Sequence, residues 1–190
     1  GTPYGETYSY NELLHLATVC EHYNCLLIID EAYIEFSDAV SLDSVASVND
    51  NIIVLRTLSK GYGSAGVRIG YSISSESNRE LLLRVSSMNA ISSPAVVWLS
   101  IVNDYKPEFD EYISSVRANR DVIVQLCRMN NIPVINSECN FLHILCELSD
   151  RFITSRVEHF HLQWTRLSIP GDENTLIKIC GELNVNSRTL

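Results

Sequence analysis

The chain has 190 residues, which is enough for one domain or for a domain with a small appendage. A hydrophobic content of 46% and a charged content of 19% exclude a disordered chain. The formal net charge of -9 argues against nucleic acid as the main partner, and the apolar stretches are too short to cross a membrane.

The N-terminal stretch and the cysteines indicate in which cellular compartment the protein is found. Residues 1–10 lack the basic start and the apolar core of a signal peptide. The six cysteines form no CxxC pair, and most of them lie among apolar neighbours. We therefore predict a cytoplasmic protein with buried, free thiols.

Helical and strand patterns alternate over the first hundred residues. Ser9 and Glu12 form a capping box in front of an amphipathic helix over 10–23. "CLLIID" (25–30) and "NIIVLR" (51–56) are short and continuously apolar, a pattern typical of strands buried on both faces of a parallel sheet. "VRIGYSI" predicts a third strand. Further helices are expected over 41–48, 76–88 and 94–105, the last with Ser93 as its cap and Pro94 in its first turn.

The pattern changes in the second half of the chain. A long helix over 107–130 precedes short strands and helices; strands are predicted at 132–135, 140–146 and 164–169, and helices at 149–157 and 172–183. The predicted fold is α/β. Residues 1–105 form part of a mostly parallel sheet with flanking helices, and residues 106–190 form a connecting helix and a small α+β domain.

Polar residues follow the two apolar strands of the first half. Asp30 ends the first strand, and Lys60 follows the second. Parallel strands bring their carboxyl ends to one edge of a sheet, where ligands bind. A carboxylate there needs a cation or hydrogen-bond donors, and a lysine there readily forms an imine. This pairing fits a Schiff-base cofactor whose ring nitrogen needs a counter-ion.

Two weaker patterns predict no site of their own. "GYGSAG" (61–66) matches G-x-G-x-x-G, but a strand rather than a helix follows, so the glycines are interpreted as permitting a strained turn beside Lys60. His159 and His161 alternate on one face of a possible strand, with His143 and Cys146 in a neighbouring one. Without a tetrahedral spacing motif, we expect no metal.

The two strand ends together carry a family resemblance. "IIDEAYIEF" (28–36) with "RTLSKGYGSAGVRIGY" (56–71) resembles the pyridoxal-phosphate-dependent aminotransferases of fold type I, and within them the histidinol-phosphate aminotransferase branch. Asp30 lies thirty places before Lys60, and Arg68 lies eight places after it. "WTRLSIPGDENTL" (164–176) is similar to the family's carboxylate-binding arginine strand. The resemblance covers nearly the whole chain but only about the C-terminal half of the family's usual protein.

The resemblance implies a pyridoxal 5'-phosphate cofactor and roles for its neighbours. Lys60 would form the Schiff base and move the proton on the substrate's Cα atom. Asp30 would keep the pyridine nitrogen protonated, which makes the ring an electron sink. Tyr33 would donate a hydrogen bond to the phenolic oxygen of the cofactor.

Further residues would hold the phosphate and the substrate. The family implies a phosphate site made of Arg68, Ser59 and Thr57, because a guanidinium donates two parallel hydrogen bonds. Arg166 would bind the α-carboxylate of an amino-acid or amino-phosphate substrate. Thr2 occupies the place of a family asparagine that contacts the phenolic oxygen.

The half of the large domain that precedes residue 1 in the family is absent from this sequence. We therefore expect a homodimer or a complementary chain that supplies the rest of the site and covers the apolar strands. Two other functions stay open: a decarboxylase of the same fold, such as the threonine-phosphate decarboxylase relatives, or a non-catalytic truncated homologue that acts as an interaction protein.

Overall fold

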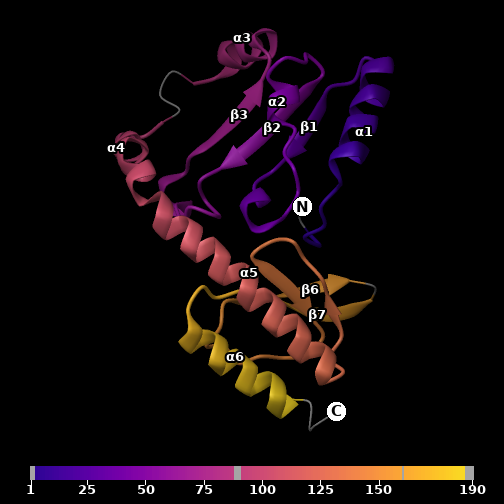
Figure 1. Cartoon of the computed structure of the whole chain (residues 1–190), viewed down its shortest axis with the longest axis vertical. Coiled ribbons are helices and arrows are strands. Elements are labelled where there is room, and N and C mark those ends of the chain that lie inside the picture. The colour runs from indigo at the N-terminus through magenta and orange to yellow at the C-terminus, as the bar shows by residue number, and fades with distance from the viewer. Residues whose placement is uncertain (1–2, 88–90, 160, 187–190) are drawn as a thin grey trace. The chain divides into compact units, whose positions relative to one another are not determined.

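The computed structural model describes residues 3–87, 91–159 and 161–186, and Figure 1 shows the chain. It divides into two compact units, Thr7–Phe109 and Gly1–Glu6 with Asp110–Leu190. The division therefore falls inside the long helix rather than after residue 105, and the first six residues belong to the second unit. In the described part of the chain, no helix is long and apolar enough to cross a membrane.

The first helix, α1 (Tyr10–His22), begins where the capping box predicts. The Ser9 hydroxyl accepts a hydrogen bond from the Glu12 amide, and the Glu12 carboxylate accepts one from the Ser9 amide at 2.8 Å. Both donors would otherwise lack a partner at the helix start, so the local sequence fixes this end of α1.

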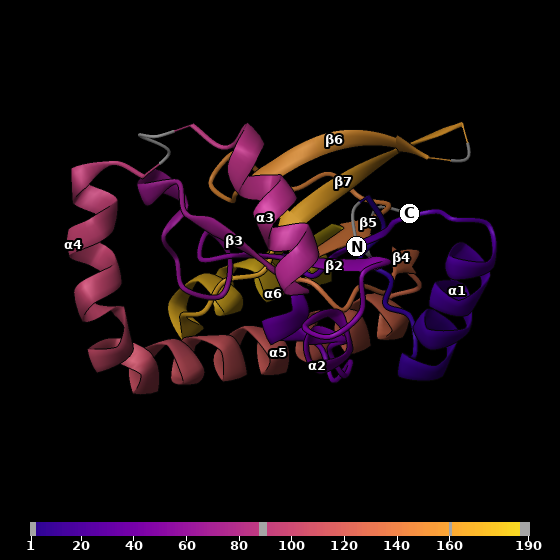
Figure 2. The same ribbon diagram turned by 90° about the horizontal axis from the view of Figure 1, so that it is seen from above.

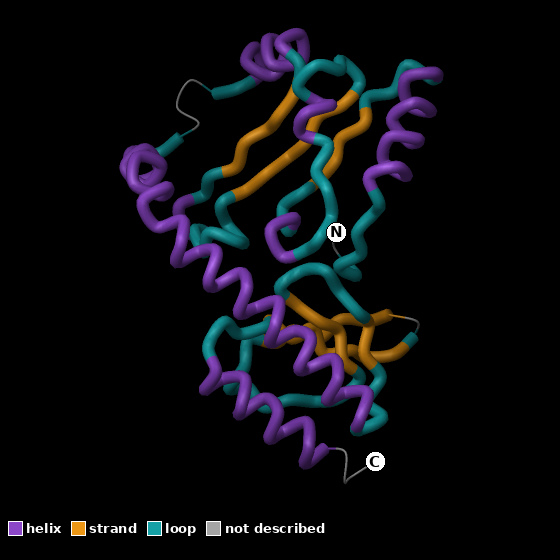
Figure 3. The backbone as a smooth tube through the Cα atoms, in the orientation of Figure 1, coloured by secondary structure: helices purple, strands orange, loops and turns teal. Residues whose placement is uncertain are grey.

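Three strands form the sheet of the first unit: β1 (Leu27–Asp30), β2 (Ile52–Thr57) and β3 (Gly70–Ser74), in that order across the sheet (Figure 3). β1 and β2 are parallel, whereas β3 is antiparallel to β2. The sheet is mixed because the stretch between β2 and β3 holds only a short 3-10 helix, η2 (Ala65–Val67), and a parallel return needs a longer crossover.

Helices cover one face of this sheet. Buried side chains of α1, β2 and α2 (Asp43–Ala46) form a hydrophobic core there, made of Ala17, Leu42, Ala46, Ile52 and Val54. On the opposite face, Ile28 of β1 is 56% exposed and Leu55 of β2 is 40% exposed. Ile53 of β2, on the same face as Leu55, is nevertheless only 5% exposed. The prediction that both strands are buried on both faces is therefore wrong for Ile28 and Leu55 but holds for the first three residues of β2.

The remaining helices of the first unit follow the predicted order. A 3-10 turn, η1 (Ile34–Phe36), follows β1; α3 spans Glu76–Val85; and α4 (Ser93–Ile101) continues into the 3-10 helix η3 (Val102–Tyr105). The cap of α4 is Ser92 rather than Ser93, since the Ser92 hydroxyl accepts from the Ala95 amide. Of the predicted helix 76–88, its last residue lies outside the described residues.

The second unit packs two helices, α5 (Lys106–Met129) and α6 (Glu173–Asn186), with an antiparallel sheet. Its strands are β4 (Val134–Ile135), β5 (Phe141–Ile144), β6 (Thr154–His159) and β7 (Leu162–Ser168), in the order β4-β5-β7-β6. Figure 2 shows β6 and β7 running side by side as a hairpin.

The β6 strand corrects the prediction of a helix over 149–157. Thr154 and Val157 are β-branched, and they occupy β6 opposite Leu167 and Trp164 of β7. Ladder pairing with β7 satisfies the backbone of this segment, so tertiary context decides the structure of an ambiguous sequence.

One end of this sheet carries two buried imidazoles. The ring centroids of His143 and His159 lie 4.8 Å apart, and that of Tyr4 lies 4.6 Å from His159. His161 instead lies in the β6–β7 turn with φ 61°, so the prediction that it shares a strand face with His159 is wrong. Among the described residues, no group of three ligands could hold a metal ion.

Burial, together with the charges of His159 and Arg166, lowers the pKa of His143 from 6.5 to about 4, and burial is the largest of these causes. Arg166 is the cross-strand partner of His143 on β7. Neither nitrogen of the His143 ring has a hydrogen-bond partner in the described part of the chain. The folded protein therefore keeps this imidazole neutral at pH 7.

The depressed pKa predicts a loss of stability in acid. Between pH 6.5 and about 4 the unfolded chain binds a proton on His143 that the folded chain does not, so the free energy of unfolding should fall over this range and level off below it. Replacing His143 by leucine should remove about 1–3 kcal/mol of this fall, measured by urea unfolding at pH 7 and pH 4.5. His15→Gln, at an exposed position of α1, is the control. An unchanged pH dependence in His143→Leu contradicts the prediction.

Candidate active site

Three of the predicted site residues lie at one edge of the first sheet. Asp30 ends β1, and its register partner is Leu55 of β2. Lys60 follows the carboxyl end of β2, and Arg68 precedes β3. Because β3 runs antiparallel, its first residue pairs with Thr57 at the end of β2. The carboxyl ends of two strands and the amino end of the third therefore meet at this edge.

Asp30, Lys60 and Tyr33 differ in exposure and contacts. The Asp30 side chain is exposed, and its carboxylate accepts a hydrogen bond from the Ala32 amide at 3.0 Å. Lys60 and Tyr33 are half-buried, and the Lys60 Nζ atom lies 5.2 Å from the centroid of the Tyr33 ring. The lysine amine is thus held over an aromatic ring that follows β1.

Hydroxyl groups and a guanidinium occupy the β2–β3 connection. The Thr57 hydroxyl lies 2.9 Å from that of Ser59 and accepts a hydrogen bond from the Ser59 amide at 3.1 Å. Arg68 is exposed, has a left-handed backbone with φ 61°, and donates to the Ala65 carbonyl at 3.3 Å. Gly63 has φ 58°, and a short 3-10 helix and β3 follow it. This agrees with the interpretation of the glycines as a turn rather than a dinucleotide fingerprint.

A buried ion pair beneath this edge was missed from the sequence. The Glu31 carboxylate accepts from Arg56 Nε at 2.8 Å, from the Ser41 hydroxyl at 2.7 Å and from the Leu42 amide at 3.3 Å. Both side chains are largely buried. The signal available in the sequence was the arginine in an otherwise apolar strand, which needs a carboxylate partner.

A second carboxylate, Glu35, faces the same arginine. Its Oε1 atom lies 3.8 Å from Arg56 Nη1, and its buried Oε2 atom has no hydrogen-bond partner among the described residues. Burial raises the pKa of Glu35 more than the neighbouring Arg56 lowers it. The Glu35 side chain also packs against Gly61, because a Cβ atom at Gly61 would lie 3.1 Å from both Cβ and Cγ of Glu35.

The other two predicted residues do not belong to this edge as described. Arg166 lies on β7 of the second unit, where its guanidinium carbon is 3.9 Å from the centroid of the Phe141 ring. Thr2 lies outside the described residues.

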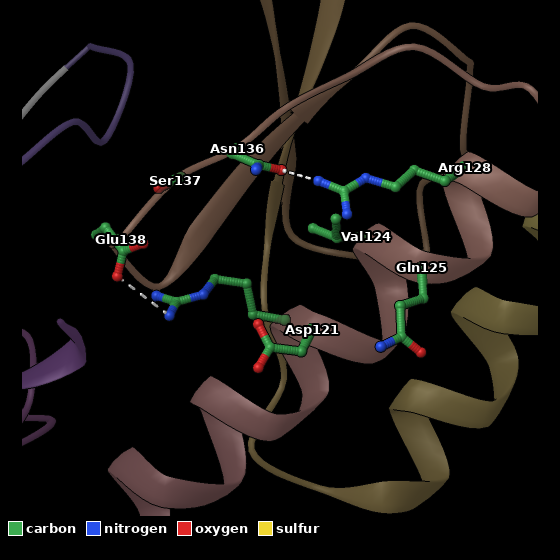
Figure 4. A pocket seen from close by; sticks show the side chains of 8 residues that line it. Asp121, Val124, Gln125, Arg128, Asn136, Ser137 and Glu138 are labelled. Atoms are coloured by element: carbon green, nitrogen blue, oxygen red, sulfur yellow. Dashed lines mark hydrogen bonds and ion pairs between the residues drawn. The ribbon is translucent and has the colours of Figure 1, made fainter. Parts of the chain in front are cut away.

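A pocket of about 290 Å³ lies between α5 and residues 136–138 of the second unit (Figure 4). Arg120 donates to the Cys139 carbonyl at 3.0 Å and lies 3.5 Å from the Glu138 carboxylate. Arg128 reaches Asn136 at 3.5 Å. These contacts hold α5 against the residues that precede β5. We therefore interpret the polar side chains around this pocket as structural.

Residues 1–184 match the family model described as "Aminotransferase class I and II". A histidinol-phosphate aminotransferase of Haloferax volcanii is 34% identical over 148 residues, which are 78% of this chain and 39% of that protein. One from Ruminiclostridium cellulolyticum is 31% identical, over 75% of this chain and 39% of that protein. The chain thus spans less than half the length of these relatives.

Solved structures share the fold. Histidinol-phosphate aminotransferase from Sinorhizobium meliloti, in complex with pyridoxal-5'-phosphate, matches with a TM-score of 0.83 and 21% identity, over 99% of this chain and 55% of that chain. L-threonine-O-3-phosphate decarboxylase from Porphyromonas gingivalis matches with a TM-score of 0.79 and 17% identity, over 97% and 61% of the two chains. On the match of its sequence to the family over residues 1–184, the chain belongs to the class I and II aminotransferases.

Proposed function

We propose that this chain contributes the part of the active site that contains the catalytic lysine, in a pyridoxal-phosphate-dependent aminotransferase similar to histidinol-phosphate aminotransferase. The substrates would be an amino acid or amino phosphate and a 2-oxo acid. The observation that supports the proposal most is the convergence of Asp30, Lys60 and Arg68 at one edge of the sheet in a chain that matches this family.

The residues at the edge fit a phosphorylated aldehyde cofactor. Such a group needs an amine, an anion for its ring nitrogen and a cation for its phosphate. Among the described residues, neither Asp30 nor Arg68 forms an ion pair, so both charges are free to meet a ligand. When bound, pyridoxal phosphate supplies an electron sink for carbanion chemistry.

Each residue would then have a defined role. Lys60 would hold the cofactor covalently and would move the proton on the substrate's Cα atom. Asp30 would pair with the protonated ring nitrogen, and Tyr33 would donate to the phenolic oxygen. Arg68, Ser59 and Thr57 would bind the phosphate, and Thr2 would take the place of the family's asparagine.

Arg166 binds the substrate carboxylate in this proposal. Its guanidinium carbon lies over the Phe141 ring, 3.9 Å from the centroid, and it forms no ion pair with another described residue. Arginine suits this task because its planar fork matches a carboxylate and stacks on an aromatic ring. The match to a decarboxylase, at 17% identity, concerns the fold alone. The relatives in sequence that are more than 30% identical, from Haloferax volcanii and Ruminiclostridium cellulolyticum, are histidinol-phosphate aminotransferases, so amino transfer is the function we propose.

Covalent capture of the cofactor tests the role of Lys60. Borohydride reduction in the presence of pyridoxal phosphate should fix the cofactor on Lys60, and mass spectrometry of tryptic peptides should locate it. Lys60→Ala should abolish the adduct, whereas Lys106→Ala and Lys178→Ala should leave it unchanged. Labelling confined to Lys106 or Lys178 would overturn the assignment.

Asp30→Asn separates cofactor binding from turnover. The amide keeps the shape but removes the negative charge, so the cofactor should still bind while turnover falls by about two orders of magnitude or more. Absorbance titration measures binding, and amino transfer is measured in whichever assembly is active. Unchanged turnover would make Asp30 a structural residue only.

We also propose a cytoplasmic protein that works as a homodimer or with a complementary chain. All six cysteines are free, which suits a reducing compartment; the predicted burial holds for Cys127 and Cys139, whereas Cys25 is exposed. The exposed apolar residues of the bare sheet face and of α4 support an assembly; on α4, Val96 is 56% and Val97 is 62% exposed.

Light scattering tests the assembly. The chain has a mass of 21.4 kDa, and the species in solution should be at least twice as heavy or should become so with the complementary chain. Cofactor affinity of the 190-residue chain alone should be weak, because the predicted second half of the phosphate site is absent. A monomer that binds pyridoxal phosphate tightly would contradict both expectations.

A further inference from the structure

The guanidinium of Arg56 faces two carboxylates with unequal contacts. Glu31 receives Arg56 Nε at 2.8 Å, together with the Ser41 hydroxyl and the Leu42 amide. Glu35 lies 3.8 Å from Arg56 Nη1. Since one cation cannot balance two buried anions, and Glu31 holds three donors, Arg56 chiefly neutralises Glu31.

Glu35 is therefore the carboxyl group of this cluster that is left to take a proton. Its side chain is 14% exposed, and its Oε2 atom is buried without a hydrogen bond from any described residue. An ionised oxygen in that position would cost more than a protonated one, because burial penalises the charged form. Burial accordingly raises the pKa of Glu35.

The Cβ and Cγ atoms of Glu35 contact the chain segment that contains Lys60. A Cβ atom at Gly61 would lie 3.1 Å from Cβ and Cγ of Glu35, closer than most side-chain contacts, so a larger residue there would push the Glu35 side chain away by a few tenths of an ångström. Gly61 directly follows Lys60. The charged groups that face Glu35 are Arg56 from β2 and Glu31 from the end of β1, and Lys60 is on the segment against its stem.

We propose that Glu35 is a positioning residue for Lys60, acting through its contact with Gly61. A negative charge on Glu35 places a second anion beside Arg56, moves the Glu35 side chain and thereby shifts the Lys60–Gly61 segment. The reactivity of the Lys60 amine then depends on the protonation of Glu35. This inference rests on the proposed function for its catalytic meaning, but its physical content does not require the cofactor.

Competitive labelling with trace acetic anhydride tests the proposal. The chain has three lysines, so mass spectrometry gives the reactivity of Lys60 relative to Lys106 and Lys178 between pH 6 and pH 9. Glu35→Gln imitates the protonated carboxyl group. It should change the reactivity of Lys60 about three- to ten-fold from that of the wild type at the alkaline end of the range, where Glu35 carries its charge. Glu76→Gln, on the exposed side of α3, is the control.

A second pair of variants separates charge from packing. Glu35→Ala removes the Cγ atom that contacts Gly61 and should change the reactivity of Lys60 at every pH. Gly61→Ala adds a Cβ atom that pushes against the same part of Glu35 and should also change the reactivity of Lys60 at every pH. Identical Lys60 profiles in the wild type and Glu35→Gln would overturn the proposal, even if Glu35→Ala fails to fold. Capture of pyridoxal phosphate by wild-type Lys60 is measured in parallel. If Lys60 does not capture pyridoxal phosphate, the proposed function is overturned. The role of Glu35 is then still decided by the labelling experiment.

Discussion

The buried ion pair between Glu31 and Arg56 is the interaction on which the first unit depends. It joins the residue after β1 to β2, and the same carboxylate accepts hydrogen bonds at the start of α2. Three elements that are distant in sequence thus share one buried carboxylate. Removing either partner would leave an uncompensated charge in the interior, which costs several kcal/mol. The pair also fixes the place from which the β2–β3 connection departs, and that connection carries Lys60.

The functional edge could be predicted from spacing because each strand was recognisable by itself. Short apolar runs ended in Asp30 and shortly before Lys60, and parallel pairing aligns such ends. The antiparallel return of β3 was not predicted, yet it is what brings Arg68 back to the same edge. A pattern of apolar residues reports that a strand exists but carries no sign of its direction, which depends on the length of the connection.

The errors elsewhere have a common physical cause, which is that the deciding contacts are distant in sequence. Residues 149–157 had an ambiguous periodicity, and pairing with β7 made their second half the strand β6. Burial of Ile28 was inferred from hydrophobicity alone, but burial also needs a covering element, and the core helices α1 and α2 pack on the other face. The buried position of Glu35 was not predicted, because nothing in the local sequence signals the approach of Gly61.

The charges of the first unit form two layers with different energetics. The inner layer is made of Glu31, Arg56 and Glu35 and is buried; the Glu31–Arg56 pair supports the fold, whereas the Oε2 atom of Glu35 has no hydrogen-bond partner among the described residues. The outer layer, made of Asp30 and Arg68, is exposed and forms no ion pair within the described chain, so it is free for a ligand. Lys60 is intermediate in exposure and lies beside Tyr33. The reactivity of a partly buried lysine can respond to buried charges in its surroundings while the amine stays accessible to a ligand. Covalent catalysis by an amine requires both properties.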